Sequence, residues 1–173
     1  MTNFRKFTVP ALSAALLAAG DQASQAWAVR HLPLLEPRAL LPGILGVVHV
    51  RTTGVAFSLL STLDPRWVHP MLILATVLAM AAVLAYIWHL PGKGTAPLGL
   101  GLILGGAVGN LIDRWRLGYV VDFIDLHWRA HHWPTFNVAD IGISMGVALL
   151  VADMLFFSKE HADASRPAAG RKP

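Results

Sequence analysis

Hydrophobic and polar positions follow one another in long blocks along this chain. Apolar stretches cover about residues 7–29, 68–90, 97–112 and 136–157. Their lengths approach the roughly 20 residues that cross the hydrocarbon core of a bilayer. Polar stretches at about 30–67 and 113–135 separate the first apolar stretch from the second and the third from the fourth. The pattern predicts a mainly α membrane protein with four transmembrane helices and both termini on one side.

The two polar stretches predict loops outside the membrane. Within the first, Val47–Val50 and Val55–Leu59 are β-favouring runs on either side of Arg51-Thr52-Thr53-Gly54, which predicts a small hairpin. The fold class therefore includes a small β-containing loop domain. We expect residues 1–158 to form a single membrane domain. The tail, 159–173, is rich in Ala, Pro and charge, and predicts disorder.

The second and third apolar stretches are joined by a tight turn. The stretch at 68–90 has no charged residue, and Pro91-Gly92-Lys93-Gly94 follows it, so the third stretch returns antiparallel. That third stretch is rich in glycine, and small residues allow transmembrane helices to approach closely. We therefore expect it at the centre of the bundle.

The composition agrees with lipid as the surrounding solvent. Only 14% of the 173 residues are charged, whereas a soluble domain has about a quarter. Cysteine is absent, which excludes disulfides, thiolate nucleophiles and metals bound by cysteine. The net charge of +4 comes from scattered basic residues, which indicates charges flanking a membrane and no nucleic-acid partner. Basic residues divide equally between the two sides, so charge alone leaves the orientation open.

Carboxylates near membrane spans are the candidate functional groups, because such charges are costly and tend to mark function. The antiparallel path places four of them at one membrane face: Asp21, Asp113, Asp122 and Asp140. Asp153 follows Asp140 by thirteen helical residues, which puts it roughly 20 Å away near the other surface. We interpret Asp153 as an interfacial charge. Asp125 is interpreted either as a solvated loop acid or as a substrate contact.

A structural explanation competes with a catalytic one for these acids. The carboxylates could cap helices and pair with Arg114, Arg116 or Arg129, and we favour this for Asp21 and Asp113. Asp122 and Asp140 each follow a short apolar run that would hold the acid at an apolar boundary. Two carboxylates in one site cannot both ionise cheaply, so one keeps a proton while the other acts as a base. This pair could activate a water molecule to attack an amide bond.

Three histidines in the second polar stretch could suggest a metal site. His127, His131 and His132 lack a transition-metal spacing such as His-Glu-x-x-His. We interpret them as interfacial histidines flanked by aromatic residues, and we expect neither a metal nor a cofactor.

Three ordered motifs resemble the signature boxes of the lipoprotein signal peptidase (signal peptidase II) family. They are Gly105-Gly106-Ala107-Val108-Gly109-Asn110-Leu111-Ile112-Asp113-Arg114, Gly118-Tyr119-Val120-Val121-Asp122-Phe123 and Phe136-Asn137-Val138-Ala139-Asp140. The resemblance extends over about residues 8–157, including the four spans and Gly54-Val55-Ala56-Phe57-Ser58.

The resemblance implies an aspartic endopeptidase that cuts diacylglyceryl-modified prolipoproteins before their lipidated cysteine. It implies a multi-pass protein of the bacterial inner membrane, with its active site toward the periplasmic face and both termini cytoplasmic. Expected partners are prolipoprotein substrates and membrane lipids, and the protein is expected to be a monomer.

The resemblance also implies a role for individual residues. The catalytic pair falls on Asp122 and Asp140, and the polar positions that support it fall on Asn110, Asp113, Arg114 and Asn137. Asp21 falls on the acid of the first helix, and Gly54 and Phe57 fall on the loop lining the substrate groove. The sequence departs from the family's pattern at Gln25, Thr52 and Val55, where Lys, Asn and Ala are common. All three departures lie in the first half of the chain.

Two other functions suit some of these features. A small proton-coupled carrier would also place carboxylates within a membrane, but its relay would need polar groups through the whole depth. A non-catalytic assembly factor that binds lipoproteins would keep the groove without needing both acids.

Overall fold

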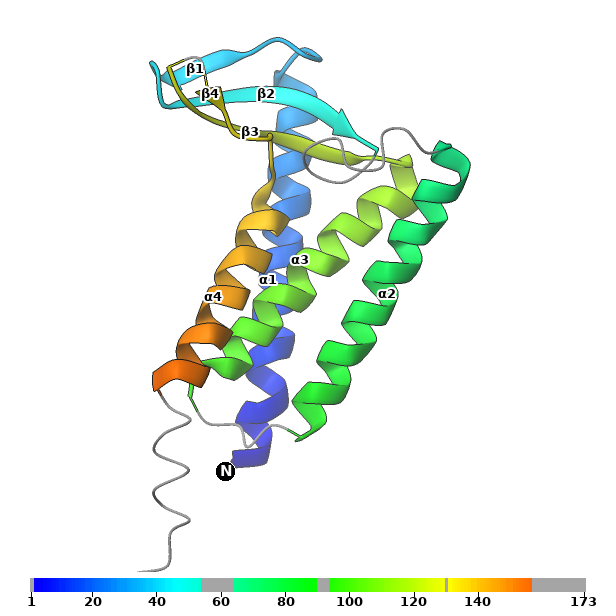
Figure 1. Cartoon of the computed structure of the whole chain (residues 1–173), viewed down its shortest axis with the longest axis vertical. Helices are drawn as coiled ribbons and strands as arrows, with labels where there is room; N and C mark the ends of the chain where they lie inside the picture. Colours follow the sequence, from blue (N-terminus) through cyan, green and yellow to red (C-terminus); the bar gives the residue numbers. More distant parts are fainter. Residues whose placement is uncertain (1, 54–63, 90–93, 130, 157–173) are drawn as a thin grey trace, which may run out of the picture.

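The computed structural model describes residues 2–53, 64–89, 94–129 and 131–156. Helices α1 (Thr2–His31), α2 (Pro65–His89), α3 (Ala96–Leu117) and α4 (Val138–Phe156) form a bundle. Strands β1 (Arg38–Leu41), β2 (Leu45–Thr52), β3 (Val120–Trp128) and β4 (His131–His132) form a sheet across one end of it (Figure 1). The start of α1 and the end of α4 both lie at the opposite end.

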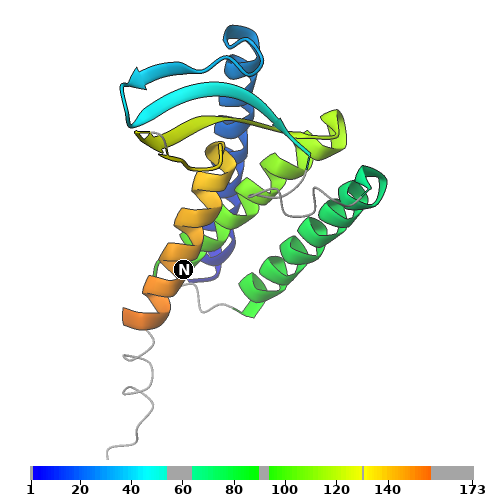
Figure 2. The ribbon, with the colours of Figure 1, turned by 45° about the horizontal axis from the view of Figure 1, so that its top comes forward.

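The sheet is antiparallel throughout, with the strand order β1-β2-β3-β4. Its central pair, β2 and β3, places Val50 opposite Asp122 and Thr52 opposite Val120, with a register shift between Val47 and Val50. The sheet curves above the ends of α1 and α4, while α2 lies to one side (Figure 2). The strand that carries Asp122 therefore lies directly above the helix bundle.

The predicted turn at Arg51–Gly54 is wrong in its first half. Arg51 and Thr52 belong to β2, which pairs with β1 on one side and β3 on the other. The sequence could not reveal this pairing because β3 lies about seventy residues away. The expected second arm of the hairpin, 55–59, lies outside the described residues.

The second polar stretch, expected to be a loop, contains the end of a helix and two strands. Helix α3 continues past Ile112 to Leu117, and Gly118 then takes a left-handed conformation with φ of 78°. The backbone N–H of Gly118 donates to the carbonyl of Arg114 at 3.1 Å, which closes the helix and directs the chain into β3.

Helix α3 lies at the centre of the bundle, as its glycines predicted, in contact with the other three helices. A Cβ on Gly106 would lie 2.4 Å from the carbonyl oxygen of Ala139 in α4. A Cβ on Gly105 would lie 2.7 Å from the carbonyl oxygen of Ala14 in α1. Only glycine permits both approaches, and they bring α1 and α4 together against the same helix.

Within the described residues, three helices are long and apolar enough to cross a membrane: Arg66–His89, Ala96–Leu117 and Val138–Phe156. Helix α1 has 30 residues but is not among them, so the expected count of four spans is not confirmed. It carries Asp21, Gln22 and Gln25 in its second half, and these residues lower its apolar content. Helix α2 instead exposes large side chains such as Leu74 and Leu78, which fits contact with lipid.

Candidate active site

The four acids that span counting assigned to one membrane face all lie near the sheet. Asp21 belongs to α1, Asp113 to α3 and Asp122 to β3, and their exposed fractions are 0, 2 and 4%. Asp140 lies in the first turn of α4 and is partly buried. Four elements thus contribute carboxylates to a region that water scarcely reaches.

Asn137 and Asp140 hold the start of α4 through a reciprocal pair of hydrogen bonds. The backbone N–H of Asp140 donates to Asn137 Oδ1 at 3.0 Å, and the backbone N–H of Asn137 donates to Asp140 Oδ2 at 3.3 Å. This is the geometry of a capping box, with Asn at the N-cap and an acid three residues later. The local sequence therefore fixes the Asp140 carboxylate relative to the helix.

The same asparagine joins the two candidate catalytic acids. Asn137 Nδ2 donates to Asp122 Oδ1 at 2.9 Å and to Asn110 Oδ1 at 3.2 Å. Asn110 Nδ2 in turn donates to Asp140 Oδ1 at 2.9 Å. Asn137 is completely buried, so two amides lock Asp122 and Asp140 into one connected network.

Asp122 has a second donor on the neighbouring strand. Thr52 Oγ1 donates to Asp122 Oδ2 at 2.6 Å. Burial and, to a smaller extent, the nearby charge of Asp140 raise the pKa of Asp122 to about 7, against the opposing effect of the Thr52 and Asn137 hydrogen bonds. Near neutral pH this carboxyl group therefore exchanges a proton readily, as an acid–base catalyst requires.

Asp21 and Asp113 hold the elements that carry the other two acids. Asp21 Oδ1 accepts a hydrogen bond from the backbone N–H of Ala139, so α1 supplies a further cap to α4 at 2.9 Å. Asp113 Oδ2 accepts from the backbone N–H of Val121, the residue before Asp122, at 3.2 Å. Their remaining oxygens accept from Gln25 and Gln22 at 2.9 and 2.8 Å.

The arginines do not pair with these acids in the way that a purely structural explanation of the acids predicted. Among the residues that the structure describes, none of these four acids forms an ion pair with an arginine within 4 Å. Arg114 Nη1 donates to the carbonyl of Asn110 at 3.2 Å, and its charge acts on Asp140, Asp122 and Asp113 through space. Neutral amides, a hydroxyl and backbone N–H groups instead provide the direct contacts.

The structure thus brings together Asp21, Asn110, Asp113, Arg114, Asp122, Asn137 and Asp140. Three residues of the first loop lie outside the described residues. They are Gly54 and Phe57, which were expected to line the substrate groove, and Val55. Gln25 and Thr52 are the other two residues that depart from the family's pattern. Gln25 donates a hydrogen bond to Asp21, and Thr52 donates one to Asp122. Both therefore contact the acids of the site.

Sequence reasoning missed two members of this network. Thr52 was considered only for substrate contacts, because its pairing with β3 is not visible locally. Gln22 was passed over, although it lies in the same polar cluster of α1 as Asp21 and Gln25. A polar run within an otherwise apolar helix was the available signal.

The other two acids have different surroundings. Asp153 Oδ1 accepts from the backbone N–H and the hydroxyl of Thr95, at 2.8 and 3.1 Å, and so caps the start of α3 at the opposite end of the bundle. Asp125 is 5% exposed and lies beside His127 and His132. Its interpretation as a solvated loop acid was therefore wrong.

The fold and the site define a helical membrane protein with linked carboxylates beneath a small sheet. A sequence profile of the family described as Signal peptidase (SPase) II matches residues 13–156. A lipoprotein signal peptidase from Geobacter metallireducens is 43% identical over 154 residues, which cover 88% of this chain and 92% of the relative. The lipoprotein signal peptidase of Oleidesulfovibrio alaskensis is 42% identical over 141 residues, covering 82% and 90%. The chain belongs to the signal peptidase II family.

Solved structures support the same fold. A structure described as a bacterial membrane enzyme, determined by the in meso method at 2.3 Å resolution, superposes with a TM-score of 0.73. It is 23% identical in sequence, and the match covers 96% of each chain. A second structure with the same description, at 1.9 Å resolution, gives a TM-score of 0.71 and covers 87% of this chain and 94% of that one.

Proposed function

We propose that this protein is a membrane aspartic endopeptidase that removes signal peptides from diacylglyceryl-modified prolipoproteins. Asp122 and Asp140 form its catalytic pair. The observation that carries the proposal is the network in which Asn137 and Asn110 link these two carboxyl groups, one of which has a pKa of about 7. Membership of the signal peptidase II family supports the substrate class.

The reaction follows from a pair that holds one proton between its two members. The ionised aspartate takes a proton from a water, and that water attacks the scissile carbonyl. The protonated aspartate donates to the carbonyl oxygen as the tetrahedral intermediate forms, and a proton then passes to the leaving amine. Because the two groups are coupled, the pH dependence of the rate belongs to the pair.

The fixed surroundings of the pair contribute by orientation. Asn137 and Asn110 keep the carboxyl groups at set positions, so little reorganisation is needed when a peptide arrives. Asp21 and Asp113 anchor α4 and β3, the elements that carry the pair. We assign these four residues to positioning, and Arg114 to offsetting the negative charge of the cluster.

Cleavage of a defined precursor tests the proposal. The protein, purified in detergent, is incubated with a diacylated precursor, alongside Asp122→Asn, Asp140→Asn and the control Asp153→Asn at the far end of the bundle. We expect full cleavage by the parent and the control, and cleavage at least about 100-fold slower by either active-site variant. Variants that cut as fast as the parent would remove the pair from the mechanism. A parent that binds the precursor without cutting it would indicate an assembly factor.

We further propose that the protein lies in the bacterial inner membrane with the sheet toward the periplasm and both termini in the cytoplasm. The absence of native cysteine permits a direct test. A single cysteine at the exposed Leu40 of β1 should react with an impermeant maleimide in intact spheroplasts. One at the exposed Phe156, at the end of α4, should react only after lysis. The reverse labelling pattern would invert the proposed orientation.

A further inference from the structure

A second cluster of potential ligands lies further along the strand that carries Asp122. It consists of Asp125 and His127 on β3 and His132 on β4. One ligand atom from each of these residues can be chosen so that all three lie within 4.8 Å of one another. Because side chains alternate along a strand, Asp125 points to the face opposite Asp122. The cluster is therefore separate from the candidate catalytic pair.

Two distances within this cluster match the spacing of ligands on one metal ion. His132 Nδ1 lies 2.8 Å from Asp125 Oδ1, and His127 Nδ1 lies 3.2 Å from Asp125 Oδ2. Two ligands bound to one zinc ion at about 2.0–2.2 Å lie roughly 2.8–3.6 Å apart in tetrahedral or octahedral geometry. The two imidazole rings are stacked, with centroids 4.7 Å apart and planes 24° apart, and both present Nδ1 to the same carboxylate.

A histidine–carboxylate hydrogen bond explains only half of the cluster. His132 shares a hydrogen bond with Asp125. His127 Nδ1 is buried and, despite its distance of 3.2 Å from the carboxylate, has no hydrogen-bond partner of acceptable geometry within the described part of the chain. Leaving a buried polar atom unsatisfied is energetically unfavourable. Coordination of a cation would occupy the lone pairs of both imidazoles and the carboxylate together.

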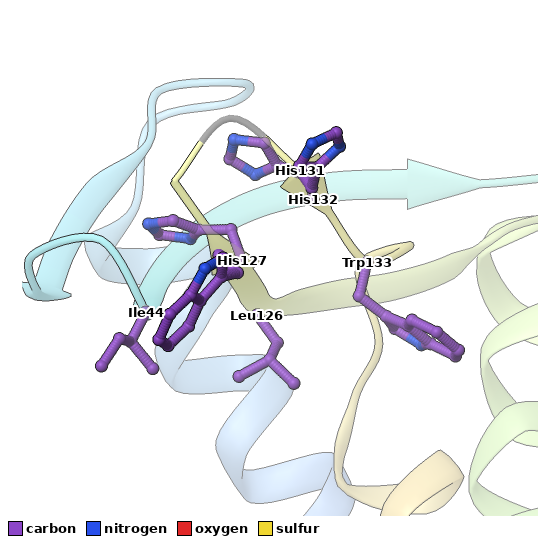
Figure 3. A pocket seen from close by; sticks show the side chains of 7 residues that line it. Ile44, Leu126, His127, His131, His132 and Trp133 are labelled. Atoms are coloured by element: carbon purple, nitrogen blue, oxygen red, sulfur yellow. The ribbon is translucent and has the colours of Figure 1, made fainter.

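An open pocket lies beside the two histidines of the cluster. A pocket of about 350 Å³ is lined by His127 and His132, together with His131 and Trp133 (Figure 3). On the neighbouring strand, Gly46 pairs with Asp125, and a Cβ there would lie 3.4 Å from Asp125 Oδ2. The pocket borders both imidazole rings, and a Cβ at Gly46 would make only ordinary contact with the carboxylate.

We propose that Asp125, His127 and His132 bind one divalent transition-metal ion of the zinc class. Two imidazoles and one carboxylate are ligands that such ions prefer to the all-oxygen set chosen by magnesium or calcium. The ion joins the two-residue strand β4 to β3, which otherwise rests on the pairs His127–His132 and Trp128–His131. Its role is to stabilise the tip of the sheet, and it takes no part in the chemistry at Asp122 and Asp140.

Metal titration tests this site without any measurement of peptide cleavage. The full-length protein is purified in detergent through a tag free of histidine, stripped with a chelator, and titrated calorimetrically with zinc chloride, cobalt chloride or magnesium chloride. We expect one zinc or cobalt ion per chain and no magnesium. Bound cobalt should also give a visible absorption spectrum that reports nitrogen and oxygen ligands.

Variants then assign the ion to these residues. His127→Ala and His132→Ala should each lower the zinc affinity at least about tenfold, the loss seen even for residues outside the coordination shell. The matched control is His131→Ala, which removes an exposed imidazole of the same pocket and should leave the affinity unchanged. Because the His132 side chain is 56% exposed, its variant should fold, as circular dichroism will verify. The absence of saturable zinc binding, or equal affinity in all four proteins, would overturn the proposal.

Discussion

The two ends of the helix bundle use aspartates in the same way but differ in what surrounds them. At the sheet end, Asp21 accepts a hydrogen bond from the backbone N–H of Ala139 in α4, and Asp140 accepts one from that of the N-cap residue Asn137. At the opposite end, Asp153 accepts one from Thr95 at the start of α3. Each carboxylate satisfies donors that a helix leaves unpaired and interacts favourably with the helix dipole.

The two ends differ because, within the described residues, only the sheet end has a strand lying over the helix ends. There β3 adds Asp122, and Asn137 links it to the network of Asp140. Asp153 instead accepts hydrogen bonds from the backbone N–H and the hydroxyl of Thr95. A capping aspartate by itself thus stabilises a helix. When a second carboxyl group lies close to it, the two can share one proton.

The largest effect should come from removing either carboxylate at the sheet end. Asp122→Asn and Asp140→Asn should each lower kcat by about 10²–10⁴-fold, the usual contribution of acid–base catalysis. The double variant should be no worse than the more damaging single one, because the two groups act as a unit. Steady-state cleavage of a lipidated precursor measures this, and losses that multiply would show that the acids work independently.

Breaking the link between the carboxylates should have the next largest effect. Asn137→Ala removes the donor to Asp122 and the acceptor for Asp140 while leaving both acids in place. We expect kcat to fall by about 10–100-fold through misplacement, and the free energy of unfolding to fall by about 1 kcal/mol through loss of the cap. Asn137→Ser, whose uncharged hydroxyl can still cap α4 but which lacks the amide, separates the two effects. An alanine variant with unchanged kcat would contradict the role given to Asn137.

Removing a single donor to Asp122 should shift the pH profile. The Thr52 hydroxyl stabilises the ionised carboxylate, so it lowers the pKa, and Thr52→Val should raise it above about 7. The protonated form of Asp122 then persists to higher pH. The alkaline limb of the profile of kcat against pH should therefore move to higher pH by about one unit. Thr53→Val, at the adjacent exposed position, serves as the control. An unmoved or downward-shifted limb would contradict this assignment.

The smallest effect on catalysis should come from the far end of the bundle. Asp153→Ala removes the acceptor for Thr95 and should lower the free energy of unfolding by about 1 kcal/mol, while kcat stays within about twofold. Asp153→Asn retains an acceptor and should lose less stability. Thermal unfolding in detergent measures both variants. A large loss of activity in Asp153→Ala would mean that the two ends are coupled.

The sequence alone determined most of the helical arrangement. Blocks of apolar residues located the helices, because lipid exposure and helix packing demand them over about 20 residues. The glycines of α3 predicted its central position, which the approach of Gly106 to Ala139 confirms. Counting residues along antiparallel helices also gathered Asp21, Asp113 and Asp140 at one end and separated Asp153, because helix length fixes depth.

Only the tertiary structure decided which groups contact one another. Thr52 reaches Asp122 through the pairing of β2 with β3, seventy residues apart in the chain, and no local pattern records such a pairing. The same pairing buries Asp122 and thereby raises its pKa. Asp125 meets two histidines because the short strand β4 folds back on β3. The sequence specifies the residue types, but strand register and helix packing determine the distances between these residues and their burial.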